Sequence, residues 1–159
     1  MALLEAARTL AEAVATRDEA DAVWRVADRA LAEVIGHRLF TILIHDAASG
    51  TVTRCYSSRP DDYPVEGSKH MGPTSWGDLL LTQGKPFIGN DAAAIRWAFP
   101  DHEQIIAMGL SSAINLPVRL PGRTLGTFNL LHEAGHYREE HLEIGAVLAA
   151  IVAPLMLKV

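Results

Sequence analysis

The sequence predicts an α+β fold in which terminal helices cover one face of an antiparallel sheet. The first observation is a pair of turn signals, Asp46–Gly50 and Leu120–Arg123, each of which joins two apolar segments of strand length. The second is the helical periodicity of apolar residues before the first strand and after the last. Hairpins join antiparallel neighbouring strands, and in α+β folds the helices commonly pack on one face of an antiparallel sheet. We therefore expect the terminal helices to cover one face.

Two helices are expected before the sheet. Apolar residues line one side of 1–15 and one side of the segment that follows Glu19. The run Thr16–Glu19 has the pattern of a capping box, in which the Thr16 hydroxyl takes the Glu19 amide and the Glu19 carboxylate reaches back. Gly36 is expected to end the second helix, since glycine accepts the left-handed conformation of a C-terminal cap.

Four expected strands form two hairpins. The segments Leu39–His45 and Thr51–Ser57 are rich in β-branched and aromatic residues, as strands usually are. The second hairpin joins Ser112–Val118 to Leu125–Leu131 through a Pro-Gly pair. Proline fixes φ at the second position of a type II turn, and glycine accepts the positive φ required at the third.

The middle of the chain, residues 58–110, is expected to be an irregular cover. It holds a short helix at Trp76–Thr82 that Ser75 is expected to cap, and an edge strand at Lys85–Ile88. Two weak helical segments follow, divided by Pro100. A segment of this length inside a compact domain is usually functional.

The last expected helix, Arg138–Leu157, is apolar on nearly all sides. A helix of that kind must be buried on nearly all sides, and a sheet covers only one of them. We therefore expect this helix and the leading helix to form a parallel bundle in a homodimer.

The composition argues against several classes of partner and location. A net charge of −5 argues against nucleic acid and anionic membranes. The longest apolar run, 144–157, contains Pro154 and is too short to cross a bilayer, and the N-terminal segment lacks the pattern of a signal peptide. The single cysteine, Cys55, forms no intramolecular disulfide and fits a cytoplasmic location.

Three short segments, in this order, resemble the GAF domain family: Ser111–Arg119, Gly126–Leu130 and Tyr137–Glu140. The resemblance spans 1–159 as a single domain. It implies leading helices in 1–36, the sheet and its cover in 37–136, and a C-terminal helix in 137–159.

The resemblance implies a twisted antiparallel sheet of the profilin or PAS type. The terminal helices lie on one face, and the middle segment caps a small-molecule pocket on the other. GAF domains bind cyclic nucleotides, bilins, haem or metabolites, commonly dimerise through their terminal helices, and in many cases have lost a ligand. The chain is thus expected to be a non-catalytic sensory domain for an unidentified small molecule. Two alternatives stay open: a structural dimerisation domain with an occluded pocket, and a haem or metal sensor that uses histidines.

The expected pocket residues lie on the strands and in the cap. Arg54 and Tyr56 alternate along one strand, so they are predicted to share a face, where Arg54 could pair with an anionic ligand. Trp76 and Trp97 could stack on a planar ligand or seal the face as ordinary core. The predicted set comprises Arg54, Tyr56, Met71, Trp76, Ile88, Trp97, Ser112 and Ile114.

No enzymatic activity is expected. One cysteine cannot supply both the nucleophilic and the resolving thiol of methionine sulfoxide reduction. Cys55 is expected to be a packed residue and not a bilin attachment site. Leu130 stands where the cyclic-nucleotide signature of the family has lysine, so Asn129 is expected to be structural.

The histidines are expected to be solvated and to hold no metal. His132 and His136 have the i,i+4 spacing of a helical metal site, but Gly135 lies between them. In the arrangement that the resemblance implies, Leu39–His45 and Leu125–Leu131 run parallel. That pairing would bring His45 and His132 to one end of the sheet.

Overall fold

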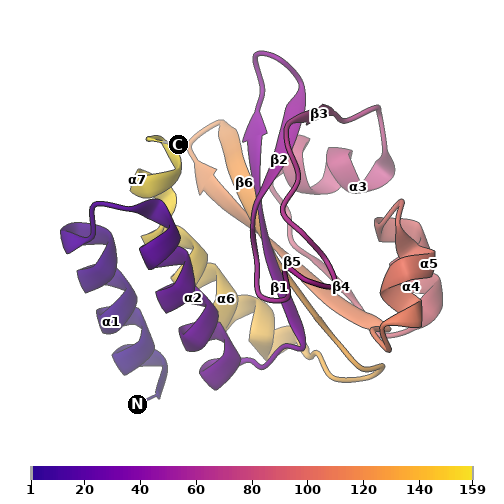
Figure 1. Cartoon of the computed structure of the whole chain (residues 1–159), viewed down its shortest axis with the longest axis horizontal. Coiled ribbons are helices and arrows are strands. Elements are labelled where there is room, and N and C mark those ends of the chain that lie inside the picture. The colour runs from indigo at the N-terminus through magenta and orange to yellow at the C-terminus, as the bar shows by residue number, and fades with distance from the viewer. Residues whose placement is uncertain (1, 159) are drawn as a thin grey trace.

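The computed structural model describes residues 2–158, in which one six-stranded sheet lies between two helical layers (Figure 1). The strand order is β3-β2-β1-β6-β5-β4, and every neighbouring pair is antiparallel. The strands are β1 (Leu39–Asp46), β2 (Thr51–Ser57), β3 (Lys69–His70), β4 (Phe87–Gly89), β5 (Ser112–Leu120) and β6 (Arg123–His132). The helices are α1 (Ala2–Thr16), α2 (Ala20–Val34), α3 (Ser75–Gly77), the π-helix η1 (Asp78–Thr82), α4 (Ala92–Ala98), α5 (His102–Ala107), α6 (Glu139–Ile151) and α7 (Ala153–Met156).

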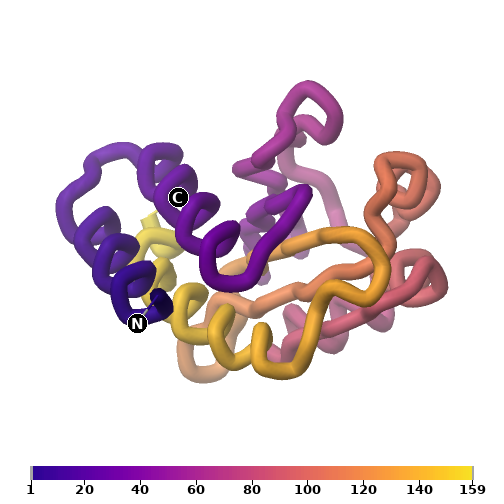
Figure 2. The backbone as a smooth tube through the Cα atoms, turned by 90° about the horizontal axis from the view of Figure 1, so that it is seen from below, coloured from indigo at the N-terminus to yellow at the C-terminus, as the bar shows by residue number. Residues whose placement is uncertain are grey.

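The terminal helices cover one face of the sheet, as the sequence predicts. Figure 2 shows α1, α2 and α6 on one side of the strands and α4 and α5 on the other. The main core lies under the terminal helices, where Phe40 and Phe128 of neighbouring strands meet edge to face at 5.3 Å between ring centroids. Apolar burial of this extent is the dominant favourable term in the free energy of folding. No helix within residues 2–158 has the length and apolar character needed to span a membrane.

The cap on the second face is built from the middle of the chain. Two smaller apolar clusters lie there, one around Ile95 and Ile105 and one around Trp76 and Leu80. They hold α3, η1, α4 and α5 against the strands, so the cap is a packed part of the fold.

The expected turns and helix ends are partly correct. Gly36 and Gly122 have the predicted positive φ, at 93° and 73°. The capping box is wrong, because α1 continues to Thr16, whose hydroxyl donates to the carbonyl of Glu12 at 2.7 Å. The N-cap of α2 is Glu19, which makes no side-chain cap.

Two further helix boundaries differ from the prediction. Thr74 caps α3 in place of Ser75, and its hydroxyl accepts the amide of Gly77 at 2.8 Å. The last helix is divided at Val152, because Pro154 has no amide hydrogen and its ring crowds the preceding turn.

The pairing of β1 with β6 is antiparallel, so the predicted parallel arrangement is wrong. Leu39 pairs with Leu131, and Ile44 pairs with Gly126. His45 lies beside Thr124, and the predicted meeting of His45 with His132 does not occur, because the two residues are at opposite ends of the pair.

Part of the apolar surface of α6 is covered by the same chain. The sheet lies on one side of α6, and α1 packs against α2 and α6 on another (Figure 2). Val147 of α6 and Leu4 of α1 stay 44% and 68% exposed. The apolar surface of α6 that is left uncovered by this chain is therefore smaller than the sequence alone suggests.

Gly126 allows the close approach of the two central strands, and an alanine there should destabilise the fold. An ideal Cβ at this position lies 2.2 Å from the backbone oxygen of Leu43, which cannot move without disturbing the strand pair. We expect Gly126→Ala to lower the free energy of unfolding by about 1–3 kcal/mol, measured by urea denaturation. Gly67→Ala is the control, since a Cβ there meets nothing within 4 Å, and equal effects would contradict the prediction.

Candidate functional site

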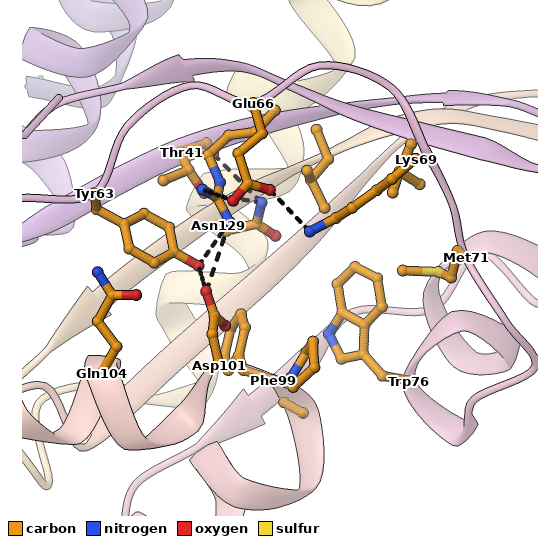
Figure 3. A pocket seen from close by; sticks show the side chains of 15 residues that line it. Thr41, Tyr63, Glu66, Lys69, Met71, Trp76, Phe99, Asp101, Gln104 and Asn129 are labelled. Carbon is orange, nitrogen blue, oxygen red and sulfur yellow. Dashed lines mark hydrogen bonds and ion pairs between the residues drawn. The ribbon is translucent and has the colours of Figure 1, made fainter.

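A cavity of about 360 Å³ lies between the second face of the sheet and the cap (Figure 3). Strands β1, β2 and β6 supply its floor, and the loop before β3, helix α3 and the α4–α5 segment supply its walls. The lining residues are Thr41, Leu43, Val52, Arg54, Tyr63, Glu66, Lys69, Met71, Trp76, Ala98, Phe99, Pro100, Asp101, Gln104 and Asn129. Its volume is within the range of about 300–1,000 Å³ typical of small-molecule sites.

Buried polar side chains form a network beneath the cavity. The Asn129 Oδ1 accepts hydrogen bonds from Asn115 Nδ2 at 2.7 Å and Thr127 Oγ1 at 3.0 Å. Asn129 Nδ2 donates to Thr41 Oγ1 at 3.2 Å. Asn115 in turn accepts from Trp76 Nε1 at 3.1 Å, so the network ties three strands to the cap. Partnered polar groups of this kind help to specify one arrangement of a core.

Arg54 organises the polar end of the cavity, and its side chain is only 9% exposed. Its Nη1 donates to Pro64 O at 2.8 Å, and its Nη2 donates to Tyr63 Oη at 2.9 Å. The guanidinium also lies 3.5 Å from Glu66 Oε1 and 3.7 Å from Asp101 Oδ2. Tyr63 Oη donates to the same oxygen of Asp101. The guanidinium is therefore held between two carboxylates.

The contacts at the polar end of the cavity determine the protonation states of Tyr63 and Glu66. Burial and the hydrogen bond to Asp101 raise the pKa of Tyr63, which is a neutral donor at pH 7. The hydrogen bond from Lys69, at 2.8 Å, lowers the pKa of Glu66, and Arg54 adds to this effect. Glu66 is therefore a carboxylate at neutral pH.

A β-bulge at Cys55 decides which side chains of β2 face the cavity. Tyr56 pairs with Ile42 while Arg54 pairs with Leu43, so Cys55 is an extra residue in the ladder. Arg54 faces the cavity, whereas Tyr56 faces the helices and donates to a carboxylate of α2 at 2.6 Å. The prediction that Arg54 and Tyr56 share a face is wrong, because strict alternation requires a strand without a bulge.

The structure brings three of the predicted pocket residues together. Arg54, Met71 and Trp76 all line the cavity. Trp97 stacks on Phe87 at 5.0 Å between ring centroids and lines an adjoining hollow. That hollow shares several residues with the cavity, including Met71 and Trp76.

Three other predicted residues, besides Tyr56, lie outside the cavity. Ile88 and Ile114 pair across β4 and β5 and pack in the core beneath the terminal helices. Ser112 is fully buried and donates to the carbonyl of Glu133 at 2.6 Å. Strand β5 also has buried apolar residues on both faces, Ala113 toward the cap and Ile114 toward the terminal helices, so apolar character alone does not distinguish the two faces.

The predicted set omits three of the four charged lining residues. Glu66, Lys69 and Asp101 lie in the middle segment, where charged residues are typical of solvated loops. Thr41 of β1 is also missing. Its position, two residues from the apolar Leu39 and Leu43 on the same face, was the available signal.

Cys55 is a packed residue with an unreactive thiol, as the sequence predicts. Burial raises the pKa of its thiol to about 12, so the thiol stays protonated at neutral pH. Its Sγ–H points to the carbonyl of Ile42 at 3.7 Å. A nucleophilic cysteine needs the opposite environment, one that lowers its pKa.

The histidines near the end of β6 stack on one another. The rings of His132 and His136 are parallel with centroids 3.7 Å apart, and His141 follows at 5.8 Å from His136. Backbone groups occupy several of their nitrogens; His136 Nε2, for example, donates to Ile35 O at 3.0 Å. Across residues 2–158, no three His, Cys, Asp or Glu side chains are placed to hold a metal ion.

Replacing Arg54 by leucine should destabilise the protein. The change removes two hydrogen bonds and leaves Glu66 and Asp101 without their shared cation, although both carboxylates retain contact with solvent. We expect Arg54→Leu to lower the free energy of unfolding by about 2–3 kcal/mol in chemical denaturation. The exposed Arg8→Leu should change it by less than about 0.5 kcal/mol, and a loss of that small size for Arg54→Leu would refute the assigned role.

The histidine stack should make stability fall in mild acid. Burial lowers the pKa of His132 and His141, and the neighbouring His136 or Arg138 adds to this effect. The unfolded chain then takes up protons below about pH 6.5 that the folded protein resists. We expect the free energy of unfolding to fall from pH 7 to pH 5.5, and to fall less in His132→Gln. The exposed His70→Gln serves as the control and should retain the wild-type pH dependence.

Comparisons with known proteins agree with this architecture. The family model described as the GAF domain matches residues 16–156. No curated protein matches the chain. Among solved structures, the GAF domain of a phosphoenolpyruvate-protein phosphotransferase from Coxiella burnetii is 17% identical, with a TM-score of 0.76 over 98% of this chain and 93% of that one.

Two further structures show how varied proteins with this fold are. The free methionine-R-sulfoxide reductase of Neisseria meningitidis, solved with its substrate, is 18% identical, with a TM-score of 0.73 over 97% of this chain and 87% of that one. The chromophore-binding domain of a bacteriophytochrome from R. palustris is 13% identical, with a TM-score of 0.70 over 96% of this chain and 60% of that one. Identities this low show a common fold and not a common activity. Since the family model matches nearly the whole sequence, the chain belongs to the GAF domain family.

Proposed function

We propose that this GAF domain is a non-catalytic sensory domain that binds a small molecule in the cavity between sheet and cap. The observation that carries the proposal is the cavity itself, about 360 Å³ in volume and lined by both apolar and charged side chains. A structural domain with an occluded pocket would fill this space with its own aromatic residues. Here a hydrogen bond to Asn115 holds the Trp76 indole at the wall of the cavity, and the indole does not fill it.

The lining residues support binding without covalent chemistry. The chain has a single cysteine, and its thiol is protonated and outside the cavity lining. The free methionine-R-sulfoxide reductase from Neisseria shares the fold. Reduction of a sulfoxide by cysteine thiols requires a thiolate and a second thiol, and this chain has one cysteine. In our proposal the domain acts in the cytoplasm, alone or as a module of a signalling protein, and transmits occupancy of the cavity to a partner.

A metabolite library should contain compounds that raise the stability of the protein. A ligand that binds only the folded state adds about 2.7 kcal/mol to the free energy of unfolding at a hundredfold excess over its Kd. We expect a thermal-shift screen to find such a compound. Leu43→Trp, which fills the cavity from β1, should abolish the shift. Ile44→Trp, on the opposite face of the same strand, should retain it, and a hit that Leu43→Trp leaves unchanged would contradict the proposed site.

We also propose that two copies associate through the terminal helices. The exposed apolar residues Leu4 of α1 and Val147 of α6 support this proposal, because large apolar side chains on a surface favour contact with another protein. Because α6 packs on β5 and α1 packs on α6, association through these helices would couple the cavity of one copy to its partner.

Light scattering tests the association. We expect a molar mass of twice the 17.2 kDa of one chain at micromolar concentration. Val147→Glu should reduce the mass to that of one chain, because it introduces a charge into the proposed contact. Val65→Glu, at another exposed valine in the cap loop, should leave the dimer intact. A wild-type mass of 17.2 kDa would exclude the homodimer.

A further inference from the structure

We propose that the hollow beside the cavity is a second binding site, which takes a planar aromatic anion. This outer hollow is bounded by Trp97, Arg96, His102, Lys69, Met71 and Trp76. The inference goes beyond the proposed function, because it concerns a different space and a different ligand. Three observations carry it: the size of the hollow, an exposed tryptophan that is fixed in place, and an excess of positive charge.

The outer hollow has room for a small molecule. Its volume is about 540 Å³, within the range of about 300–1,000 Å³ typical of ligand sites. Figure 3 shows Trp76 and Met71 at the side of the cavity away from Tyr63. Both side chains also line the outer hollow, so they lie between the two spaces. A ligand can therefore occupy the outer hollow whether the cavity is filled or empty.

Trp97 supplies a flat aromatic wall. Of the five large apolar side chains that are exposed in residues 2–158, Trp97 alone is aromatic, and it is 47% exposed. Its ring stacks on Phe87 with centroids 5.0 Å apart and 28° between the planes. Because Phe87 belongs to β4, the stack fixes the indole against the edge of the sheet. The part of the indole that lines the hollow is available for an aromatic ligand to stack on.

The charge of the outer hollow is positive. Arg96 and Lys69 line it, and no Asp or Glu from the described part of the chain does so. The charged residues that line the cavity sum to zero: Arg54, Glu66, Lys69 and Asp101. Arg96 lines only the outer hollow, so the two spaces together carry one positive charge in excess. That excess favours an anion in the outer hollow.

Arg96 is available to bind the anion. Its side chain is exposed on α4, one residue before Trp97, and it forms no ion pair with a carboxylate within residues 2–158. A guanidinium without a partner can donate two parallel hydrogen bonds to a carboxylate or a phosphate. Arg54 in the cavity, by contrast, already lies near two carboxylates. The anion is therefore expected at Arg96, beside the ring that stacks on Trp97.

Three probes of similar size test the class of ligand. They are 2-naphthoate, 2-naphthylmethanol, which has the same rings and no charge, and decahydro-2-naphthoate, which has the charge and no aromatic ring. NMR titrations of the full chain at pH 7 follow the indole N–H signals. We expect 2-naphthoate to shift the Trp97 signal, and the signal of Trp24, buried beneath the terminal helices, to stay unchanged.

The relative Kd values of the probes report charge and stacking separately. We expect 2-naphthoate to bind about fivefold more tightly than the alcohol, because an ion pair at an exposed arginine contributes modestly to binding. It should also bind about fivefold more tightly than the saturated acid, which cannot stack on an aromatic ring.

Matched variants test the two side chains. Arg96→Gln removes the charge, so it should weaken 2-naphthoate about fivefold and leave the alcohol unchanged. Arg123→Gln makes the same change at an exposed position outside both spaces and should leave all three probes unchanged. Trp97→Leu should reduce the preference for 2-naphthoate over the saturated acid to about onefold, with Kd values taken from the backbone amides of α4. The wild-type probe series decides the class of ligand even if Trp97→Leu fails to fold.

The outcomes separate this inference from the proposed function. Leu43 lines the cavity and not the outer hollow, so 2-naphthoate should still shift the Trp97 signal in Leu43→Trp. Loss of binding in that variant would place the probe in the cavity and overturn the inference. Equal binding of 2-naphthoate and the alcohol, or an unchanged Trp97 signal at millimolar probe, would also overturn it. Neither result would affect the proposed function, which the thermal-shift screen tests at the cavity.

Discussion

The side chain of Asn129 is the interaction on which sheet, cap and cavity all depend. It lies in the central strand pair, where its amide bonds to Thr41 of β1, Asn115 of β5 and Thr127 of β6. Asn115 extends the connection to Trp76 in the cap. An unpaired amide in this position would cost about 1–3 kcal/mol, so the network favours a single placement of the cap above the sheet. The cavity keeps its shape because both its floor and one wall belong to this network.

A second constraint, the bulge at Cys55, directs the charged side chain of Arg54 into the cavity. Without the extra residue, the alternation of β2 would direct Arg54 and Tyr56 to the same face. With it, Tyr56 joins the helices and Arg54 joins the cavity, where it is bound by Tyr63 and the carboxylate of Asp101. A buried guanidinium is stable only with such partners. Tyr63 lies in the loop before β3 and Asp101 lies between α4 and α5, so Arg54 holds two separate segments of the cap together.

The two faces of the sheet thus have different chemistry and different roles. The face beneath the terminal helices is apolar and closely packed, with aromatic contacts such as that of Phe40 with Phe128. The opposite face carries polar side chains and an open space. A change in the cavity can reach the helices through the strands, because alternate residues of each strand belong to the two faces. This arrangement suits a domain in which occupancy of a site is transmitted to a helical surface.

The sequence alone determined the fold class, because hairpin signals and helical periodicity are local and survive any tertiary arrangement. Local chemistry also determined the turn at Gly122 and the packed state of Cys55. The tertiary structure decided the antiparallel pairing of β1 with β6, which no local pattern encodes, and with it the separation of His45 from His132. The tertiary structure also decided which residues line the cavity. Residues far apart in the sequence, such as Arg54 and Asp101, act together only after the cap has folded over the sheet, and a single bulge reverses the face of every residue beyond it.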